Sequence, residues 1–115
     1  MATVCEMAGT EIPNKNDSIS LIPTLKGDQK NQVLHKYLYW EFYERTFRQA
    51  VVMRDWKLIR SGMDNQRLEL YDLSKDIHED ENLAKFHPGI VQRMLSYMEE
   101  AHEPHTNWPT PRQKR

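Results

Sequence analysis

Four short runs rich in aromatic and β-branched residues decide the fold: YLYWEFY at 37–43, QAVVM at 49–53, WKLIR at 56–60 and LELYD at 68–72. Residues of these types favour extended strands, and each run has the length of a typical strand. The connections between the runs are short enough for hairpin loops. The pattern therefore predicts an antiparallel meander.

Alternation along the runs assigns side chains to the two faces of this sheet, because successive residues of a strand point to opposite sides. We expect the apolar face to collect Leu38, Trp40, Phe42, Trp56, Leu58, Leu68 and Leu70. Tyr37, Tyr39 and Glu41 then lie on the opposite face, where they are available to a ligand or to another domain.

A helix downstream is expected to cover the apolar face. Pro88 stands where a first helical residue is favoured, and apolar side chains follow it at helical spacing. That stripe consists of Ile90, Val91, Met94, Leu95, Met98 and Ala101. The predicted fold class is therefore α+β: a four-stranded antiparallel sheet with a C-terminal helix packed on one face, preceded by short helices.

Those short helices are predicted in the first quarter of the chain. The segment 1–8 carries apolar residues on one helical face, and Gly9 follows where a left-handed cap would sit. A second short helix is predicted at 18–25. The first helix starts inside its apolar stripe without a capping residue, which is unusual for a helix N-terminus. We therefore expect the chain to be part of a longer polypeptide.

The composition limits the kinds of partner. Hydrophobic residues make up 38% and charged residues 29%, with a net charge of −1. This balance gives no electrostatic basis for binding nucleic acid or an anionic membrane. The apolar runs are also too short to span a bilayer. We expect neither nucleic acid nor membrane as a partner.

The sequence contains no familiar catalytic motif: it has no glycine-rich phosphate loop, HExxH, GxSxG or pair of closely spaced cysteines. The acidic run at 74–82 lacks the ligand spacing and central glycine of an EF-hand, so we predict a solvated turn there. The histidines near the last helix are expected at the surface. No catalytic residue and no metal ligand is predicted.

Several segments together have a distinctive order: DSISLIPTL at 17–25, YLYWEF at 37–42, QAV at 49–51, DWKLIR at 55–60, LELYDL at 68–73, Asp76 and NLA at 82–84. This series resembles the C-terminal end of the formylglycine-dependent sulfatases, the arylsulfatase-like family. DWKLIR followed by LELYDL carries most of the specificity. The resemblance extends from Met1 to Trp108.

The resemblance implies a division of the chain into four parts. Residues 1–27 correspond to the end of the large sulfatase α/β domain, 28–34 to a linker, 35–104 to the C-terminal subdomain and 105–115 to an extended tail. The partner implied is the N-terminal sulfatase domain, which is missing from this chain.

That missing domain is implied to hold calcium and a formylglycine made within Cys-x-Pro-x-Arg or Ser-x-Pro-x-Arg. Cys5 is not such a residue, because Glu6-Met7-Ala8-Gly9 follows it. The chain is therefore expected to be a C-terminal fragment that is inactive alone, from a parent that hydrolyses sulfate esters of a sulfated carbohydrate or an aryl sulfate. The compartment stays open between periplasmic, secreted and lysosomal-type locations.

Loops of this subdomain can contribute to the rim of the substrate pocket in such sulfatases. The resemblance therefore makes His35, Tyr39, Glu41 and Arg45 candidates for substrate contact. Two other functions remain open at this point. One is a free-standing α+β interaction module, and the other is a carbohydrate-binding module that uses the aromatic faces of Tyr37, Tyr39 and Trp40.

Overall fold

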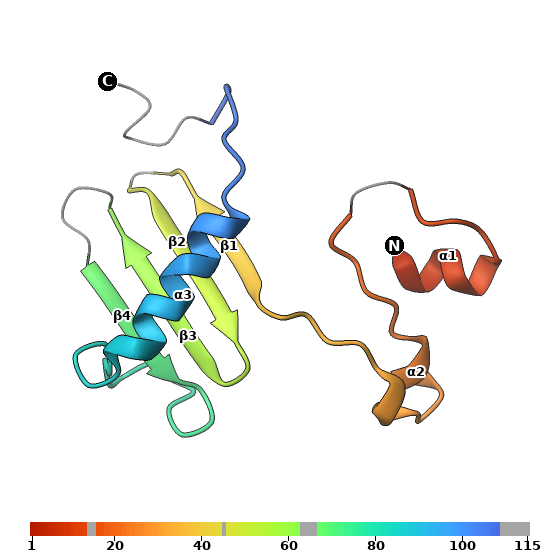
Figure 1. Cartoon of the computed structure of the whole chain (residues 1–115), viewed down its shortest axis with the longest axis horizontal. Helices are drawn as coiled ribbons and strands as arrows, with labels where there is room; N and C mark the ends of the chain where they lie inside the picture. Colours follow the sequence, from red (N-terminus) through yellow and green to blue (C-terminus); the bar gives the residue numbers. More distant parts are fainter. Residues whose placement is uncertain (14–15, 45, 63–66, 109–115) are drawn as a thin grey trace. The chain divides into compact units, whose positions relative to one another are not determined.

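A computed structural model describes residues 1–13, 16–44, 46–62 and 67–108. The chain divides into two compact units, Met1–Lys36 and Tyr37–Arg115 (Figure 1). Among the described residues, none of the helices has the length and apolar character needed to cross a membrane.

The first unit contains the helices α1 (Ala2–Ala8) and α2 (Ile22–Leu25) and the 3₁₀ turn η1 (Gln29–Asn31). Gly9 ends α1 with a φ of 65°, the left-handed cap that the sequence predicts. The predicted helix at 18–25 forms only from Ile22. Its first half is held differently, because the Leu21 amide donates to Thr3 Oγ1 at 3.0 Å and Ser18 Oγ accepts from the Ala2 amide at 3.0 Å.

The second unit is built on a sheet of four antiparallel strands in the order β1-β2-β3-β4, which confirms the predicted meander. The strands are β1 (Leu38–Phe42), β2 (Arg48–Met53), β3 (Trp56–Ser61) and β4 (Arg67–Asp72). Each boundary lies within one residue of the prediction. A two-residue turn joins β2 to β3, and Arg54 adopts a φ of 54° there.

The helix α3 (Pro88–Ala101) crosses one face of this sheet (Figure 1). The core between the two layers consists of Val51, Leu58, Leu70, Val91, Met94 and Met98. Ile90 and Leu95 pack at its margin, so the predicted apolar stripe is confirmed. Full burial of one such side chain contributes roughly 1.5–3 kcal/mol, so this core is the main source of stability in the unit.

The predicted orientation of β1 is wrong. Tyr39 pairs with Val51, which pairs with Leu58, so Tyr39 lies on the face covered by α3. Leu38, Trp40 and Phe42 lie on the open face and are 43%, 44% and 61% exposed. A change of one residue in register would reverse every side chain of the strand, and the register formed is the one that pairs Tyr39 with Val51.

The acidic run after β4 forms the predicted turn. The Asp76 carboxylate accepts hydrogen bonds from the amides of Asp80 at 3.1 Å and Glu81 at 2.9 Å. Asn82 then holds the outer edge of β4: its side chain accepts from the Leu70 amide at 3.1 Å and donates to the Leu68 carbonyl at 3.0 Å. Asn82 thereby satisfies backbone groups that an edge strand would otherwise leave unpaired.

Candidate functional site

The densest polar site in the second unit lies on the helix side of the sheet. We call it the Glu41 cluster, and it consists of Tyr39, Glu41, Tyr43, Gln49, Arg60 and His102. Three strands, the loop after β1 and the residue following α3 each contribute at least one member. The register that carries Tyr39 under the helix is what brings these side chains together.

The Glu41 carboxylate is the centre of the cluster and accepts four hydrogen bonds. Its Oε1 accepts from the Tyr39 hydroxyl, from Gln49 Nε2 at 3.1 Å and from His102 Nδ1 at 2.6 Å, and its Oε2 accepts from the Tyr43 hydroxyl at 2.7 Å. An ionised carboxylate only accepts, so Nδ1 of His102 must carry a hydrogen in this arrangement.

Behind the carboxylate, Gln49 connects the cluster to Arg60. The Gln49 amide oxygen accepts from Arg60 Nε at 2.7 Å and from its Nη2, while Nε2 donates to the Tyr39 hydroxyl at 2.6 Å. Gln49 is 2% exposed and Arg60 7% exposed. A buried guanidinium next to a glutamine has few alternative partners, so these bonds fix both rotamers and the orientation of the amide.

The protonation states follow from these contacts. Burial acts to raise the pKa of Glu41, but hydrogen bonds from Tyr39, Tyr43, His102 and Gln49 outweigh it and lower the pKa. Burial, and then donation to Glu41, raises the pKa of Tyr39 and raises that of Tyr43 to about 12. At neutral pH the carboxylate is therefore ionised and both phenols are protonated.

This arrangement is suited to holding structure in place. Both carboxylate oxygens of Glu41 are occupied, and its side chain is only 15% exposed. The bond to His102 joins residues 61 positions apart and fastens the end of α3 to β1. The cluster thus fixes the relative positions of β1, its following loop and the helix end.

The predicted rim candidates fall into different places. Tyr39 and Glu41 are brought together in the Glu41 cluster, whereas His35 is an exposed residue of the first unit. Arg45 lies outside the described residues. Gln49, Arg60 and His102 were not predicted as site residues.

A signal for two of those residues exists in the sequence. Gln49 and Arg60 each stand two positions from a buried strand residue, Val51 and Leu58 respectively, and so they share the covered face. Polar residues at such core-facing positions usually pair with one another.

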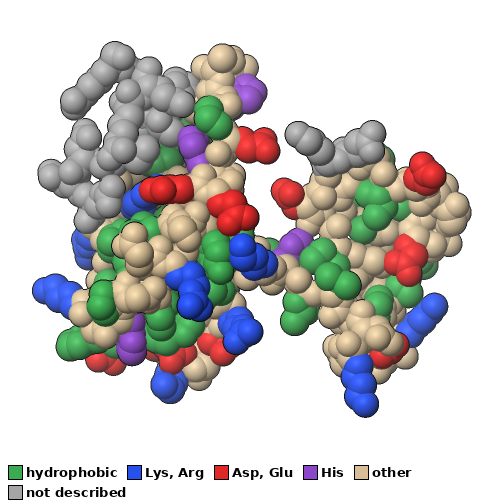
Figure 2. Space-filling model, viewed as in Figure 1, with side chains coloured by type: hydrophobic (Ala, Val, Ile, Leu, Met, Phe, Trp, Pro, Cys, Tyr) green, Lys and Arg blue, Asp and Glu red, His purple; other side chains and the backbone are tan. Residues whose placement is uncertain are grey.

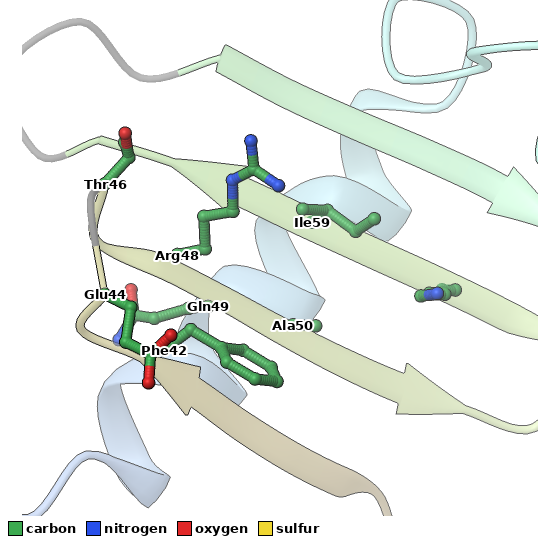
Figure 3. Close-up of a pocket in the computed structure, with 8 residues that line it drawn as sticks. Phe42, Glu44, Thr46, Arg48, Gln49, Ala50 and Ile59 are labelled. Carbon is green, nitrogen blue, oxygen red and sulfur yellow. The ribbon is translucent and has the colours of Figure 1, made fainter.

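A second feature is a hollow of about 610 Å³ on the open face of the sheet. Its lining includes the apolar side chains of Phe42, Ala50 and Ile59, with Glu44 and Arg48 nearby. Figure 3 shows these residues on the side of the strands turned away from α3. On the faces visible in Figure 2, charges of both signs are interspersed in each unit, without a broad patch of one sign.

Comparison with known proteins identifies a family and relatives that this chain resembles. Residues 1–103 match the family model described as N-sulphoglucosamine sulphohydrolase, C-terminal. The chain is 32% identical over 92 residues to a Delta 4,5-hexuronate-2-O-sulfatase of Bacteroides thetaiotaomicron, with 74% of this chain and 18% of the relative covered.

Solved structures give the same result. A Bacteroides thetaiotaomicron protein bearing the name sulfatase superposes with a TM-score of 0.74 at 30% identity, covering 85% of this chain and 22% of that one. A protein solved with its substrate D-glucosamine-2-N,6-O-disulfate shares the fold, with a TM-score of 0.69, 24% identity and coverage of 86% and 22%.

The chain spans about a fifth of the length of these relatives, since it covers 18% of one and 22% of the others. The match nevertheless includes nearly all of this chain, and the predicted resemblance is confirmed. This protein belongs to the family of sulfatase C-terminal domains typified by N-sulphoglucosamine sulphohydrolase.

Proposed function

We propose that this chain is the C-terminal subdomain of an enzyme that hydrolyses sulfate esters of sugars. The observation that carries the proposal is the family match over residues 1–103. In the overall reaction, water converts the sulfate ester to the free sugar hydroxyl and inorganic sulfate, with release of a proton. The role of the subdomain is to complete the fold and to hold loops at the edge of the substrate pocket.

The substrate class proposed is a sulfated sugar that contains a uronic acid. The relative at 32% identity is named for the 2-O-sulfate of a Δ4,5-hexuronate, and this identity supports the same class here. A third solved relative, at 26% identity and a TM-score of 0.65, belongs to the metabolism of glycosaminoglycans in Bacteroides thetaiotaomicron and supports it further. An aryl sulfate is the alternative substrate class.

The calcium and formylglycine implied by the sulfatase family do not fit the residues of this chain. Cys5 lacks the proline and arginine of the formylglycine motif. Among the described residues, no three His, Cys, Asp or Glu side chains converge as a metal site would require. Both groups are therefore assigned to an N-terminal catalytic domain, and no reaction step is assigned to this chain.

Within this role, the rim candidates divide by what their side chains already contact. Tyr39 and Glu41 are proposed as positioning residues for the loop after β1, because their polar atoms are engaged within the Glu41 cluster. His35 is exposed, and with Arg45 it remains proposed for direct contact with the sulfated substrate. An imidazolium or guanidinium would supply charge-assisted hydrogen bonds to sulfate.

The carbohydrate-binding module is not favoured by the geometry. Its three aromatic residues do not form one platform, because Trp40 lies on the open face while Tyr39 lies under α3. Tyr37 is stacked against Tyr97 of α3, with ring centroids 4.7 Å apart.

Sulfate release provides the test. A polypeptide that joins this region to its N-terminal catalytic domain should release sulfate from an unsaturated 2-O-sulfated uronate disaccharide, measured by ion chromatography, and should prefer it to an aryl sulfate. The 115-residue chain alone should release none. Turnover by the chain alone, or no release by the joined polypeptide from any sulfated sugar, would contradict the proposal.

The rim assignment has its own test in the joined polypeptide. His35→Ala should raise KM several-fold with little change in kcat, whereas His78→Ala, at another exposed histidine, should change neither. Equal KM values for the two variants would remove His35 from the rim.

A further inference from the structure

The segment that follows α3 lies at the end of the sheet where β1 leads into β2 (Figure 1). His102 ends the helix in an extended conformation, with a φ of −69° and a ψ of 116°. A tight turn follows, in which the Trp108 amide donates to the His105 carbonyl at 3.1 Å and the two residues form an antiparallel bridge. We call residues 102–108 the C-terminal strap.

The C-terminal strap is attached at two points. At its start, His102 Nδ1 lies 2.6 Å from Glu41 Oε1. At its end, the ring of Trp108 lies 6.0 Å from the ring of Tyr43, centroid to centroid, which is within the favourable range for aromatic pairs. Tyr43 also donates its hydroxyl to Glu41 at 2.7 Å and packs edge-on against Phe47 at 5.1 Å. The strap therefore contacts β1 and the first residue after it.

The connection between β1 and β2 has few determinants of its own. Its sequence, 43–47, contains no Gly, Pro, Asn or Asp, the residues that fix tight turns. Among its described residues, one backbone hydrogen bond joins two members, from the Thr46 amide to the Glu44 carbonyl at 2.6 Å. Its conformation therefore depends on contacts from other parts of the unit, and Tyr43 receives two of these from Glu41 and Trp108.

The two sides of this connection differ in what surrounds them. Tyr43 and Phe47 pack against each other, and Phe47 is only 5% exposed. Glu44, Thr46 and Arg48 are exposed and line the hollow on the open side of the sheet (Figure 3). One side of the connection is thus held by aromatic packing, while the other presents polar and charged side chains.

We infer that His102 and Trp108 are positioning residues for substrate binding, because the C-terminal strap keeps Tyr43 and Phe47 in place before a sulfated sugar arrives. This inference rests on the proposed function, in which the subdomain holds loops at the edge of the substrate pocket. Neither His102 nor Trp108 contacts the substrate. A segment that becomes ordered only on binding lowers the apparent affinity by the fraction of molecules in which it is already ordered. The strap therefore acts on KM and not on the chemical step.

The first measurement is hydrogen exchange by mass spectrometry in the 115-residue chain. Trp108→Ala and His102→Ala each remove one attachment of the strap. Trp108→Phe keeps an aromatic ring, and His102→Asn keeps a donor, because the Asn amide nitrogen takes the place of Nδ1. Phe86→Ala is the matched control, since Phe86 precedes α3 and is 72% exposed, while Trp108 follows α3 and is 59% exposed.

Both Ala variants should accelerate exchange about fivefold in the peptide covering 42–48, since the connection is then less often held. The control and the two conservative variants should stay within about twofold of the original chain. Exchange in the peptide covering 50–60 should be the same in every chain, which excludes a general loss of the sheet as the cause. Unchanged exchange at 42–48 in both Ala variants overturns the inference.

The second measurement is sulfate release from the unsaturated 2-O-sulfated uronate disaccharide by the polypeptide joined to its catalytic domain. Trp108→Ala and His102→Ala should each raise KM about fivefold and leave kcat within about twofold, and the conservative variants should restore KM. An unchanged KM, or a lower kcat at an unchanged KM, overturns the positioning role.

The two measurements separate this inference from the proposed function. If the unsubstituted joined polypeptide releases no sulfate from any sulfated sugar, the proposed function is refuted. Exchange in the 115-residue chain then still decides whether the C-terminal strap holds Tyr43 and Phe47. If the joined polypeptide is active and the Ala variants bind substrate as well as the original, the proposed function stands and the inference is wrong.

Discussion

Replacing Glu41 by Ala should destabilise the second unit by about 3 kcal/mol. The substitution removes the acceptor of four hydrogen bonds, each of which is worth roughly 1.5–3 kcal/mol when made to a charged group. These values do not add, because water can replace Glu41 at Tyr43 and His102, whose surroundings are partly exposed. The loss of stability therefore comes mainly from the Tyr39 hydroxyl and the buried Gln49 amide, whose hydrogen-bond donors lose their acceptor.

The measurement is urea unfolding of the chain followed by circular dichroism, with an unchanged m-value as evidence of two-state behaviour. For a unit of this size the loss corresponds to a fall in Tm of about 12–24 °C. Glu44→Ala is the control, because Glu44 is exposed and should change stability by less than about 0.5 kcal/mol.

A loss for Glu41→Ala that equals the control would refute the view that this cluster holds the unit together. The double variant with His102→Ala adds a second criterion. The two residues should be coupled by about 1 kcal/mol, since each removes a partner of the other.

Other consequences concern pH, the core and the sheet edge. The pKa of Glu41 is lowered in the native state, so its contribution to stability is present above its ordinary pKa of 4.5 and is lost as pH falls through the native pKa. The urea midpoint should therefore decrease at acid pH, and Glu41→Gln should make this decrease smaller. Because the pKa of Tyr43 is raised from 10.0 to about 12, its stabilisation is complete below pH 10 and is lost as pH rises toward 12, and Tyr43→Phe should remove this loss. Met94→Ala should cost about 2–5 kcal/mol in urea unfolding, since Met94 is 0% exposed and leaves a cavity; a cost under 1 kcal/mol would mean that α3 does not seal the core. Asn82→Ala should cost about 1 kcal/mol and accelerate hydrogen exchange at the Leu70 amide, and unchanged exchange there would contradict its role on the β4 edge.

The strand order and the covering helix were predictable because the connections leave little choice. The two-residue turn at Arg54 and Asp55 fixes which residues of β2 and β3 face the same side. Alternation along β3 and β4 correctly placed Leu58 and Leu70 on the covered face. Met94 and Met98 followed from helical periodicity alone.

The face of β1 could not be predicted in the same way. The connection at 43–47 has no turn signature that fixes its length, and both faces of β1 carry aromatic residues. Strand alternation states which residues share a face but does not state which face is covered. The Glu41 cluster was missed for the same reason, since it exists only in the register that pairs Tyr39 with Val51.

The position of α3 at the end of the described sheet unit has a consequence for how the chain forms during translation. All strands leave the ribosome before the helix Pro88–Ala101 does. Until that helix emerges, the side chains of Val51, Leu58 and Leu70 have no helix packed on them. The hairpins can form early, because each strand pairs with its neighbour in sequence. The unit is complete only after His102 has been synthesised. Nascent chains that stop before this residue are therefore the ones most exposed to aggregation and proteolysis.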